Sequence, residues 1–72
     1  MKYDPKEVQE YQWLHPDPLW NATERRPNQL PDPVKVEGIR KAQSQTGLLF
    51  NVTTKSGEGI WLDAGWFVGI AR

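Results

Sequence analysis

The second half of the chain alternates between apolar and polar residues, as half-buried β-strands do. Residues 48–54 place an apolar side chain or a threonine at every second position, and residues 34–37 and 60–63 repeat this alternation. Glycine-containing turn sequences separate these runs from one another. The pattern predicts that residues 34–72 form a compact antiparallel β-meander of short strands.

Breaks in the alternation predict where the sheet bends and turns. Gly38 interrupts the first run, which indicates a bulge or a sharp bend. Turns are expected at residues 44–47 and 55–59, where glycine lies among polar residues. Residues 64–65 break the chain again before the last apolar run. Because a bent sheet has unpaired strand edges, we expect the preceding part of the chain to cover them.

The start of the chain carries several signals of a helix N-terminus. Asp4 can accept a hydrogen bond as N-cap, and Pro5 suits the first helical position, where no backbone N–H is needed. Glu7 follows Asp4 at the spacing of a capping box. These signals predict a short helix over residues 5–14, which ends there because Pro16 restricts the preceding residue and lacks a donor.

A proline-rich arm follows at residues 16–33. Its five prolines exclude a long helix or a central strand. Asn21 and Glu24 have the spacing of another N-cap, which predicts one helical turn. Trp20 and Leu30 are large and apolar, so we interpret the arm as attached to the β part. In the alternative interpretation, Trp20 and its neighbours dock on a partner and are mobile without it.

Length and composition limit how the chain can be stabilised. It is predicted to form one domain, residues 1–72, with a helix in residues 1–15, the arm in 16–33 and the meander in 34–72. A domain of this size buries only about 60% of its unfolded surface. There is no cysteine, which excludes disulfides and thiolate metal sites. Stability must therefore come from packing, chiefly of the aromatic side chains.

Charge and hydropathy argue against several classes of function. The formal net charge is zero, with nine basic and nine acidic residues, whereas domains held mainly by phosphate contacts have a basic excess. No apolar run approaches the roughly 20 residues that cross a bilayer, and residues 1–5 begin no apolar signal segment. We therefore expect a cytoplasmic protein that does not associate with membranes.

Catalytic and metal-binding groups are scarce. His15 is the single histidine, and no carboxylates have the spacing of a metal loop or an acid–base pair. A catalytic triad needs a histidine beside a nucleophile and an orienting carboxylate. The position of His15 beside a proline-rich turn favours an exposed or turn-capping role instead. We expect that the chain is not an enzyme and that it needs no cofactor or metal.

In residues 59–70, a tryptophan-bearing run is followed by a break at residues 64–65 and a second apolar run, and this order resembles the end of an SH3-like barrel. In that fold a tryptophan-bearing strand leads through a single helical turn into a short last strand, which is similar to residues 59–70. Residues 39–54 are similar to the hairpin before it. With the patterns above, the resemblance predicts a mostly β fold, a small SH3-like antiparallel barrel or bent sheet with a short N-terminal helix and a proline-rich arm. The chain also resembles small phage or prophage proteins that bind and block host machinery.

The four tryptophans are too many to bury easily in so short a chain. On a strand over residues 60–63, Trp61 points away from Ile60 and Leu62, so it is either covered by the N-terminal helix or exposed. Exposed tryptophan and arginine are typical anchors of protein interfaces, whereas core packing is expected for at least two of the four tryptophans. The predicted partner-binding residues are Trp61, Trp66, Trp20, Arg40 and Arg25.

These residues support one leading hypothesis and two alternatives. The leading hypothesis is a non-catalytic protein-binding module, an inhibitor or adaptor that occupies a surface of a larger partner. In the first alternative, basic residues at 25–26 and 40–41 form one patch that binds single-stranded nucleic acid, with Trp61 or Trp66 stacking on bases. In the second, the chain is a structural subunit of an assembly. A homodimer would also supply burial that so small a chain lacks.

Overall fold

The computed structural model describes residues 3–72; residues 1 and 2, which the prediction assigned to an N-terminal helical segment, lie outside the described residues. The strands are β1 (Trp13–Pro16), β2 (Val34–Lys35), β3 (Gly38–Lys41), β4 (Leu48–Thr53), β5 (Gly59–Asp63) and β6 (Phe67–Ile70). The helical segments are α1 (Pro18–Thr23) and the single-turn 3₁₀ helices Pro5–Glu7, Arg26–Asn28 and Ala64–Trp66.

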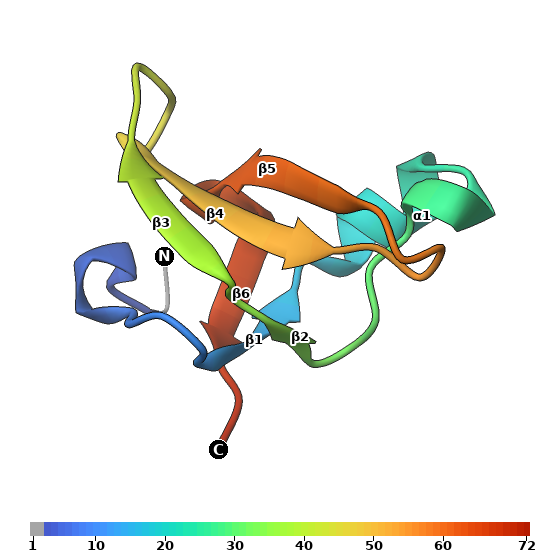
Figure 1. The fold of residues 1–72 in the computed structure, drawn as a ribbon, viewed down its shortest axis with the longest axis horizontal. Helices are drawn as coiled ribbons and strands as arrows, with labels where there is room; N and C mark the ends of the chain where they lie inside the picture. The colour runs from blue at the N-terminus through green and yellow to red at the C-terminus, as the bar shows by residue number, and fades with distance from the viewer. Residues whose placement is uncertain (1–2) are drawn as a thin grey trace.

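The strands form two small antiparallel sheets in a mostly β domain (Figure 1). One sheet has the strand order β2-β1-β6 and the other the order β3-β4-β5. Within residues 3–72 the two sheets do not close into a barrel. Over the same residues, every helix is too short or too polar to span a bilayer.

The N-terminal helix is much shorter than predicted. Asp4 caps it as expected, accepting a hydrogen bond from a backbone N–H of the first turn at 3.0 Å, and Pro5 lies at its start. The prediction of a helix over residues 5–14 is nevertheless wrong, because the helix ends at Glu7. Further along, Tyr11 adopts a φ of 70°, in the left-handed region that a right-handed helix excludes.

Strand β1 takes the place of the second half of the predicted helix. Leu14 and Pro16 are buried and the residues that alternate with them are exposed. Just before the strand, the backbone of residues 11–12 forms hydrogen bonds with Val36, at 2.6 and 2.8 Å. Residues 13–16 form a strand and not a helix because the strand forms backbone hydrogen bonds with β2 on one side and β6 on the other. The strand also buries Leu14 completely.

A second prediction, that the prolines exclude a central strand, is wrong at Pro16. This proline is the last residue of β1, which lies between β2 and β6. The register between β1 and β6 shifts between His15 and Pro16, so the proline coincides with an irregularity of the ladder. The missing N–H is tolerated there. The next residue, Asp17, resumes the contact by donating its N–H to the carbonyl of Trp66 at 2.7 Å.

A bent stretch of chain carries β2 and β3 and joins the two sheets. The N–H of Glu37 donates to the carbonyl of Asn51 at 2.7 Å, while Gly38 is also paired with Asn51. Two residues oppose one, which confirms the bulge predicted at Gly38. As a consequence, only β3, β4 and β5 form a meander. The prediction of one meander over residues 34–72 is wrong, since β2 and β6 pair with β1 instead.

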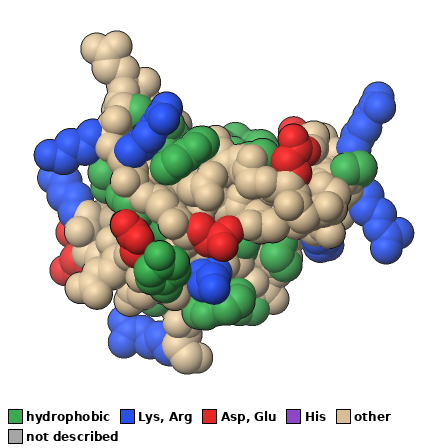
Figure 2. All heavy atoms as spheres, viewed as in Figure 1, with side chains coloured by type: hydrophobic (Ala, Val, Ile, Leu, Met, Phe, Trp, Pro, Cys, Tyr) green, Lys and Arg blue, Asp and Glu red, His purple; other side chains and the backbone are tan. Residues whose placement is uncertain are grey.

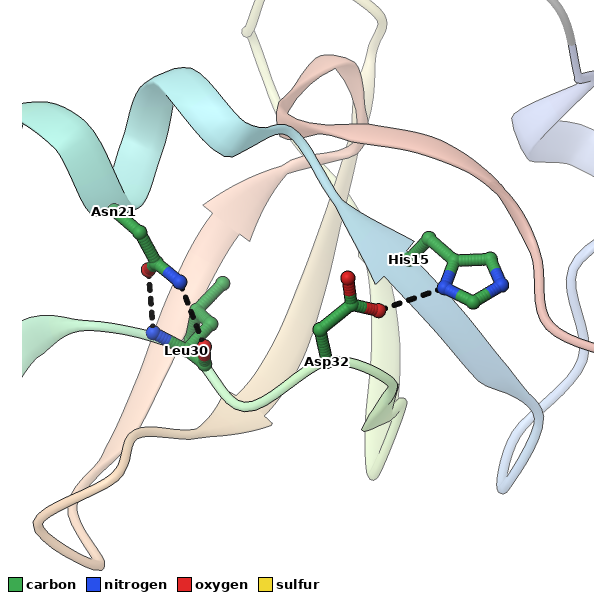
Figure 3. A network of polar contacts seen from close by, with 4 residues as sticks. All are labelled: His15, Asn21, Leu30 and Asp32. Carbon is green, nitrogen blue, oxygen red and sulfur yellow. Dashed lines mark hydrogen bonds and ion pairs between the residues drawn. The ribbon is translucent and has the colours of Figure 1, made fainter.

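The proline-rich arm is anchored to the rest of the domain through α1. A helical turn before Pro27 is confirmed, but the predicted N-cap at Asn21 is wrong, because Asp17 caps α1 and its side chain accepts from the N–H of Leu19 at 2.9 Å. Asn21 lies inside α1, and its side chain forms two hydrogen bonds with the backbone of Leu30 (Figure 3). Its Oδ1 accepts from the Leu30 N–H at 2.7 Å, and its Nδ2 donates to the Leu30 carbonyl at 2.9 Å. These two hydrogen bonds fix the backbone at Leu30, whose side chain is fully buried in the core.

Both sheets and the arm contribute to one hydrophobic core. The alternation predicted for residues 48–54 is confirmed, because Phe50, Val52 and Thr54 are buried. Phe50 of β4 packs across the core on Phe67 of β6, with ring centroids 5.8 Å apart. The buried apolar side chains are Val8, Leu14, Leu30, Val34, Val36, Phe50, Val52, Leu62, Ala64 and Phe67.

Leu14→Ala should lower the free energy of unfolding by about 2–5 kcal/mol, because it leaves a cavity at a fully buried position of β1. Urea unfolding followed by tryptophan fluorescence measures the change. Leu19→Ala is the matched control: Leu19 is 59% exposed, and its loss should change stability by less than about 0.5 kcal/mol. Equal effects of the two substitutions would contradict the central position of β1.

Candidate functional site

Trp61 lies across the outer face of the β3-β4-β5 sheet. Asn51 of β4 is the register partner of both Trp61 in β5 and Gly38 in β3. The indole ring reaches Gly38, where an added Cβ atom would lie 3.2 Å from the ring carbon Cη2. Because neighbouring strands are about 4.8 Å apart, the ring must lie along the sheet to span β4. The glycine at position 38 therefore makes room for the ring.

Arg40 lies over the same ring. Its guanidinium carbon is 4.9 Å from the centroid of the Trp61 ring, within the range of a cation–π interaction. The side chain of Trp61 is 43% exposed, so of the two positions predicted for it, exposure is confirmed. We call Trp61 and Arg40 the indole–guanidinium pair. It presents an ordered aromatic and cationic surface on the outside of the sheet.

The other predicted tryptophans lie elsewhere and are half-buried. Trp20 of α1 and Trp66 of the last 3₁₀ turn pack edge to face, with ring centroids 5.0 Å apart. The indole Nε1–H of Trp20 donates to the carbonyl of Asn28 at 2.9 Å. These contacts attach the arm to the β part, as predicted, and both rings pack against the core. The geometry thus gives this pair a structural role.

Arg25 is also separate from the indole–guanidinium pair. It is exposed and immediately precedes the 3₁₀ helix Arg26–Asn28. Figure 1 places α1 and the segment after it on the opposite side of the molecule from β3, which carries Arg40. The basic residues at 25–26 and 40–41 therefore do not form the single patch that nucleic-acid binding was predicted to use.

A second aromatic group, Tyr11, Trp13 and Lys35, was missed by the sequence reasoning. Trp13 and Lys35 are register partners in β1 and β2, and the ammonium of Lys35 lies 5.9 Å from the centroid of each aromatic ring. Tyr11 is 64% exposed and Trp13 is 48% exposed. The signal was the alternation of residues 13–16, which the helix prediction obscured.

The face of β1 that carries Trp13 also holds a hydrogen bond between His15 and Asp32 and a shallow depression. His15 Nδ1 lies 2.6 Å from Asp32 Oδ1, with both side chains exposed (Figure 3). The exposed role expected for His15 is confirmed. The depression has a volume of about 350 Å³ and is lined by Trp13, Pro33, Ala71 and Arg72. It is too open to enclose a small ligand.

Charged and apolar side chains are interspersed on the surface. Figure 2 shows hydrophobic side chains in several separate patches on one face, with Lys and Arg side chains extending mostly at its margins. The formal net charge is zero. The surface thus offers local aromatic and cationic contacts and no continuous basic stripe on the face shown.

Asp63 joins the end of β5 to the turn before β4. Its Oδ1 accepts from the N–H and the hydroxyl of Thr46 at 3.1 and 3.0 Å, and its Oδ2 accepts from the N–H of Gly65 at 2.7 Å. Burial by itself would raise the pKa of Asp63, but these donors and the nearby Ser44 hydroxyl hold it below its ordinary value. The Ser44 hydroxyl lies outside normal hydrogen-bond geometry, so we attribute the lowering mainly to Gly65 and Thr46.

Tyr3 closes the same corner from the N-terminal side. Its hydroxyl donates to the carbonyl of Ala64, next to Asp63. Burial, and secondly the negative charge of Asp63, raise the pKa of Tyr3. Tyr3 therefore stays neutral and serves as a hydrogen-bond donor that ties the start of the chain to the last 3₁₀ turn.

Comparison with known proteins does not identify the chain. No family model, no curated protein and no solved structure matches it. Within residues 3–72, no three histidine, aspartate or glutamate side chains gather where they could hold a metal ion. The candidate site is therefore defined by geometry: the indole–guanidinium pair on one sheet and the second aromatic group on the other.

Gly38→Val should displace the Trp61 ring and lower the free energy of unfolding by about 1–3 kcal/mol, because the added side chain overlaps the ring. Shifts of the Trp61 indole N–H resonance and urea unfolding measure the two effects. Gly69→Val is the matched control, since a Cβ atom at Gly69 meets no atom within 4 Å. An unchanged Trp61 resonance in Gly38→Val would show that the ring does not rest there.

Asp63→Asn should weaken the acid dependence of stability. Because the pKa of Asp63 is lower in the native state, its carboxylate stabilises the native state at pH values above the ordinary pKa of 3.8. This stabilisation is lost as the pH falls through the pKa of the native state. The substitution should destabilise the protein at neutral pH and flatten the loss of stability on acidification. Urea unfolding between about pH 7 and pH 2 measures this. Glu58→Gln, at an exposed turn, is the control and should retain the slope of the native protein.

Proposed function

We propose that the chain is a non-catalytic protein-binding module that occupies a surface of a larger partner, as an inhibitor or adaptor. The observation that carries this proposal is the position of Trp61, exposed yet held over Gly38 and beneath Arg40. Tryptophan and arginine are the residue types most enriched among the energetic anchors of protein interfaces. Here the two are adjacent and share one solvent-facing surface.

The order of the indole–guanidinium pair supports binding without large rearrangement. An interface side chain that is immobilised only on binding costs about 0.5–1.5 kcal/mol of conformational free energy. The Trp61 ring is already confined by the sheet below it and by the guanidinium 4.9 Å from its centroid. A partner therefore meets a preformed contact surface, and more of the contact energy is available for affinity.

Single-stranded nucleic acid is the less favoured partner. Base stacking needs an open ring face and a charged groove along the backbone. One face of the Trp61 ring is covered by Arg40, the basic residues are divided between distant parts of the molecule, and the net charge is zero. These features favour a protein partner over a phosphate backbone.

We also propose a relationship with SH3-like proteins. It is supported by the order of the last elements, since β5 leads through the 3₁₀ turn Ala64–Trp66 into β6. It is supported too by the bent stretch that contributes β2 to one sheet and β3 to the other. A shared architecture carries no function by itself, so the proposed activity rests on the indole–guanidinium pair.

Trp61→Ala should weaken binding to the partner by at least about 30-fold, the effect expected when an interface anchor worth about 2 kcal/mol is removed. The partner is first obtained by affinity capture from cells that produce the protein, then purified. Titration calorimetry with the native protein and the variant gives the two dissociation constants.

The control for this experiment is Leu19→Ala, which removes an exposed apolar side chain from α1, away from the indole–guanidinium pair. It should leave the dissociation constant within about threefold of the native value. The proposal fails if Trp61→Ala remains folded and binds the purified partner as tightly as the native protein. It also fails if the native protein binds labelled single-stranded DNA or RNA more tightly, with the steep salt dependence of phosphate contacts.

A further inference from the structure

Strand β5 forms one edge of its sheet, on the side of β4 opposite β3 (Figure 1). The carbonyl of Asn51 accepts from Glu37, so the backbone groups of Asn51 face the β3 side. In an antiparallel ladder, Asn51 and its partner Trp61 then form a pair without mutual hydrogen bonds. The N–H and C=O of Trp61 therefore point to the open edge, and by alternation so do those of Gly59.

The side chains of β5 leave this edge unobstructed. The Trp61 ring extends over β4 toward Gly38, away from the edge. Ile60 and Leu62 point to the opposite face, where both pack against the core. Gly59 has no side chain. A strand of another molecule could thus approach the backbone of β5 without displacing any of these groups.

The remaining edges of the two sheets carry features that oppose pairing. β3 carries Arg40 and Lys41, which would face like charges in a symmetric pairing. β6 adjoins a depression lined in part by Asp4 and Glu7, and β2 has only two residues. By contrast, residues 59–62 contain no charge and no proline. Residues 59–62 of β5 thus lack the charges and prolines by which edge strands avoid pairing with their own copies.

We propose that β5 pairs antiparallel with β5 of a second copy of this chain, which makes one continuous sheet across both molecules. Asp63 caps the 3₁₀ turn at the end of the strand. The pairing spans residues 59–61 and centres on Ile60. Gly59 then exchanges two backbone hydrogen bonds with Trp61 of the second copy, and Trp61 does so with Gly59 of the second copy. The half-buried Ile60 faces its own counterpart on the inner side.

The chemistry of this surface fits a second copy better than an unrelated strand. A symmetric pairing places apolar beside apolar and glycine beside an aromatic residue, an arrangement favourable in sheets. The zero net charge adds no repulsion between copies. This surface consists of backbone groups, so it is distinct from the side-chain surface of the proposed function.

Sedimentation equilibrium of the full chain between about 10 μM and about 1 mM tests the proposal, since one short edge makes a small and weak interface. The average mass should rise toward that of a dimer across this range. Gly59→Pro removes an edge-facing N–H at the first residue of the strand, a position at which proline occurs in edge strands, and should weaken dimerisation at least about tenfold. Gly59→Ala keeps the N–H, and its Cβ would meet only Asn51 Nδ2, at 3.8 Å. It should dimerise like the native chain.

Amide hydrogen exchange locates the interface. The N–H of Leu62 should be protected at all concentrations, because it faces β4, whereas that of Trp61 should become protected only as the dimer forms. The proposal is overturned by a monomer at about 1 mM, by a dimer whose Trp61 amide stays unprotected, or by equal dimerisation of Gly59→Pro and the native chain. Trp61→Ala keeps the backbone groups, so it should still dimerise even though the proposed function expects it to lose its partner.

Discussion

The rest of the structure depends on the position of β1 between β2 and β6. β1 is short, yet it is the only strand in its sheet with a neighbour on each side, among the residues that the structure describes. It brings an early part of the chain against the last strand, and its inward side chain Leu14 is fully buried. Such pairings are costly because they close long loops, and they are offset only when apolar surface is buried along with them. Without β1, the two-residue β2 and the apolar side of β6 would both lack a partner.

The bend between β2 and β3 explains why a functional surface arises where it does. The bulge at Glu37 and Gly38 lets one stretch of chain serve two sheets, so the core is closed without a disulfide. The same glycine leaves the outer face of β3 without a Cβ atom, and the Trp61 ring occupies that space. Gly38 thus forms part of the bulge that joins the two sheets, and it also makes room for the Trp61 ring on the surface proposed to bind a partner.

The sequence predicted local features well and long-range ones poorly. Alternation located the buried face of residues 48–54 and the outward direction of Trp61, since both follow from the two-residue period of a strand. The cap at Asp4 was also predicted, but it specifies only one turn of helix. Beyond that turn, the path of the chain is decided by backbone partners at Val36 and in β6, which lie far away in the sequence. The separation of Arg25 from Arg40 was missed for the same reason, because it depends on the path of the arm.

The exposed aromatic residues face outward because of the backbone and not because the core lacks room. Trp61, Trp13 and Tyr11 each alternate with inward-facing neighbours or lie in a turn, so their outward direction is fixed by the backbone. Each has a cation within about 6 Å of its ring, which offsets part of the cost of exposure without removing the ring from solvent. Tyr11, Trp13 and Trp61 keep 64%, 48% and 43% of their surface exposed, so each ring has apolar surface that is not buried within the domain. The exposed ring surfaces on the outer faces of the two sheets thus support the proposal that the chain binds a partner there.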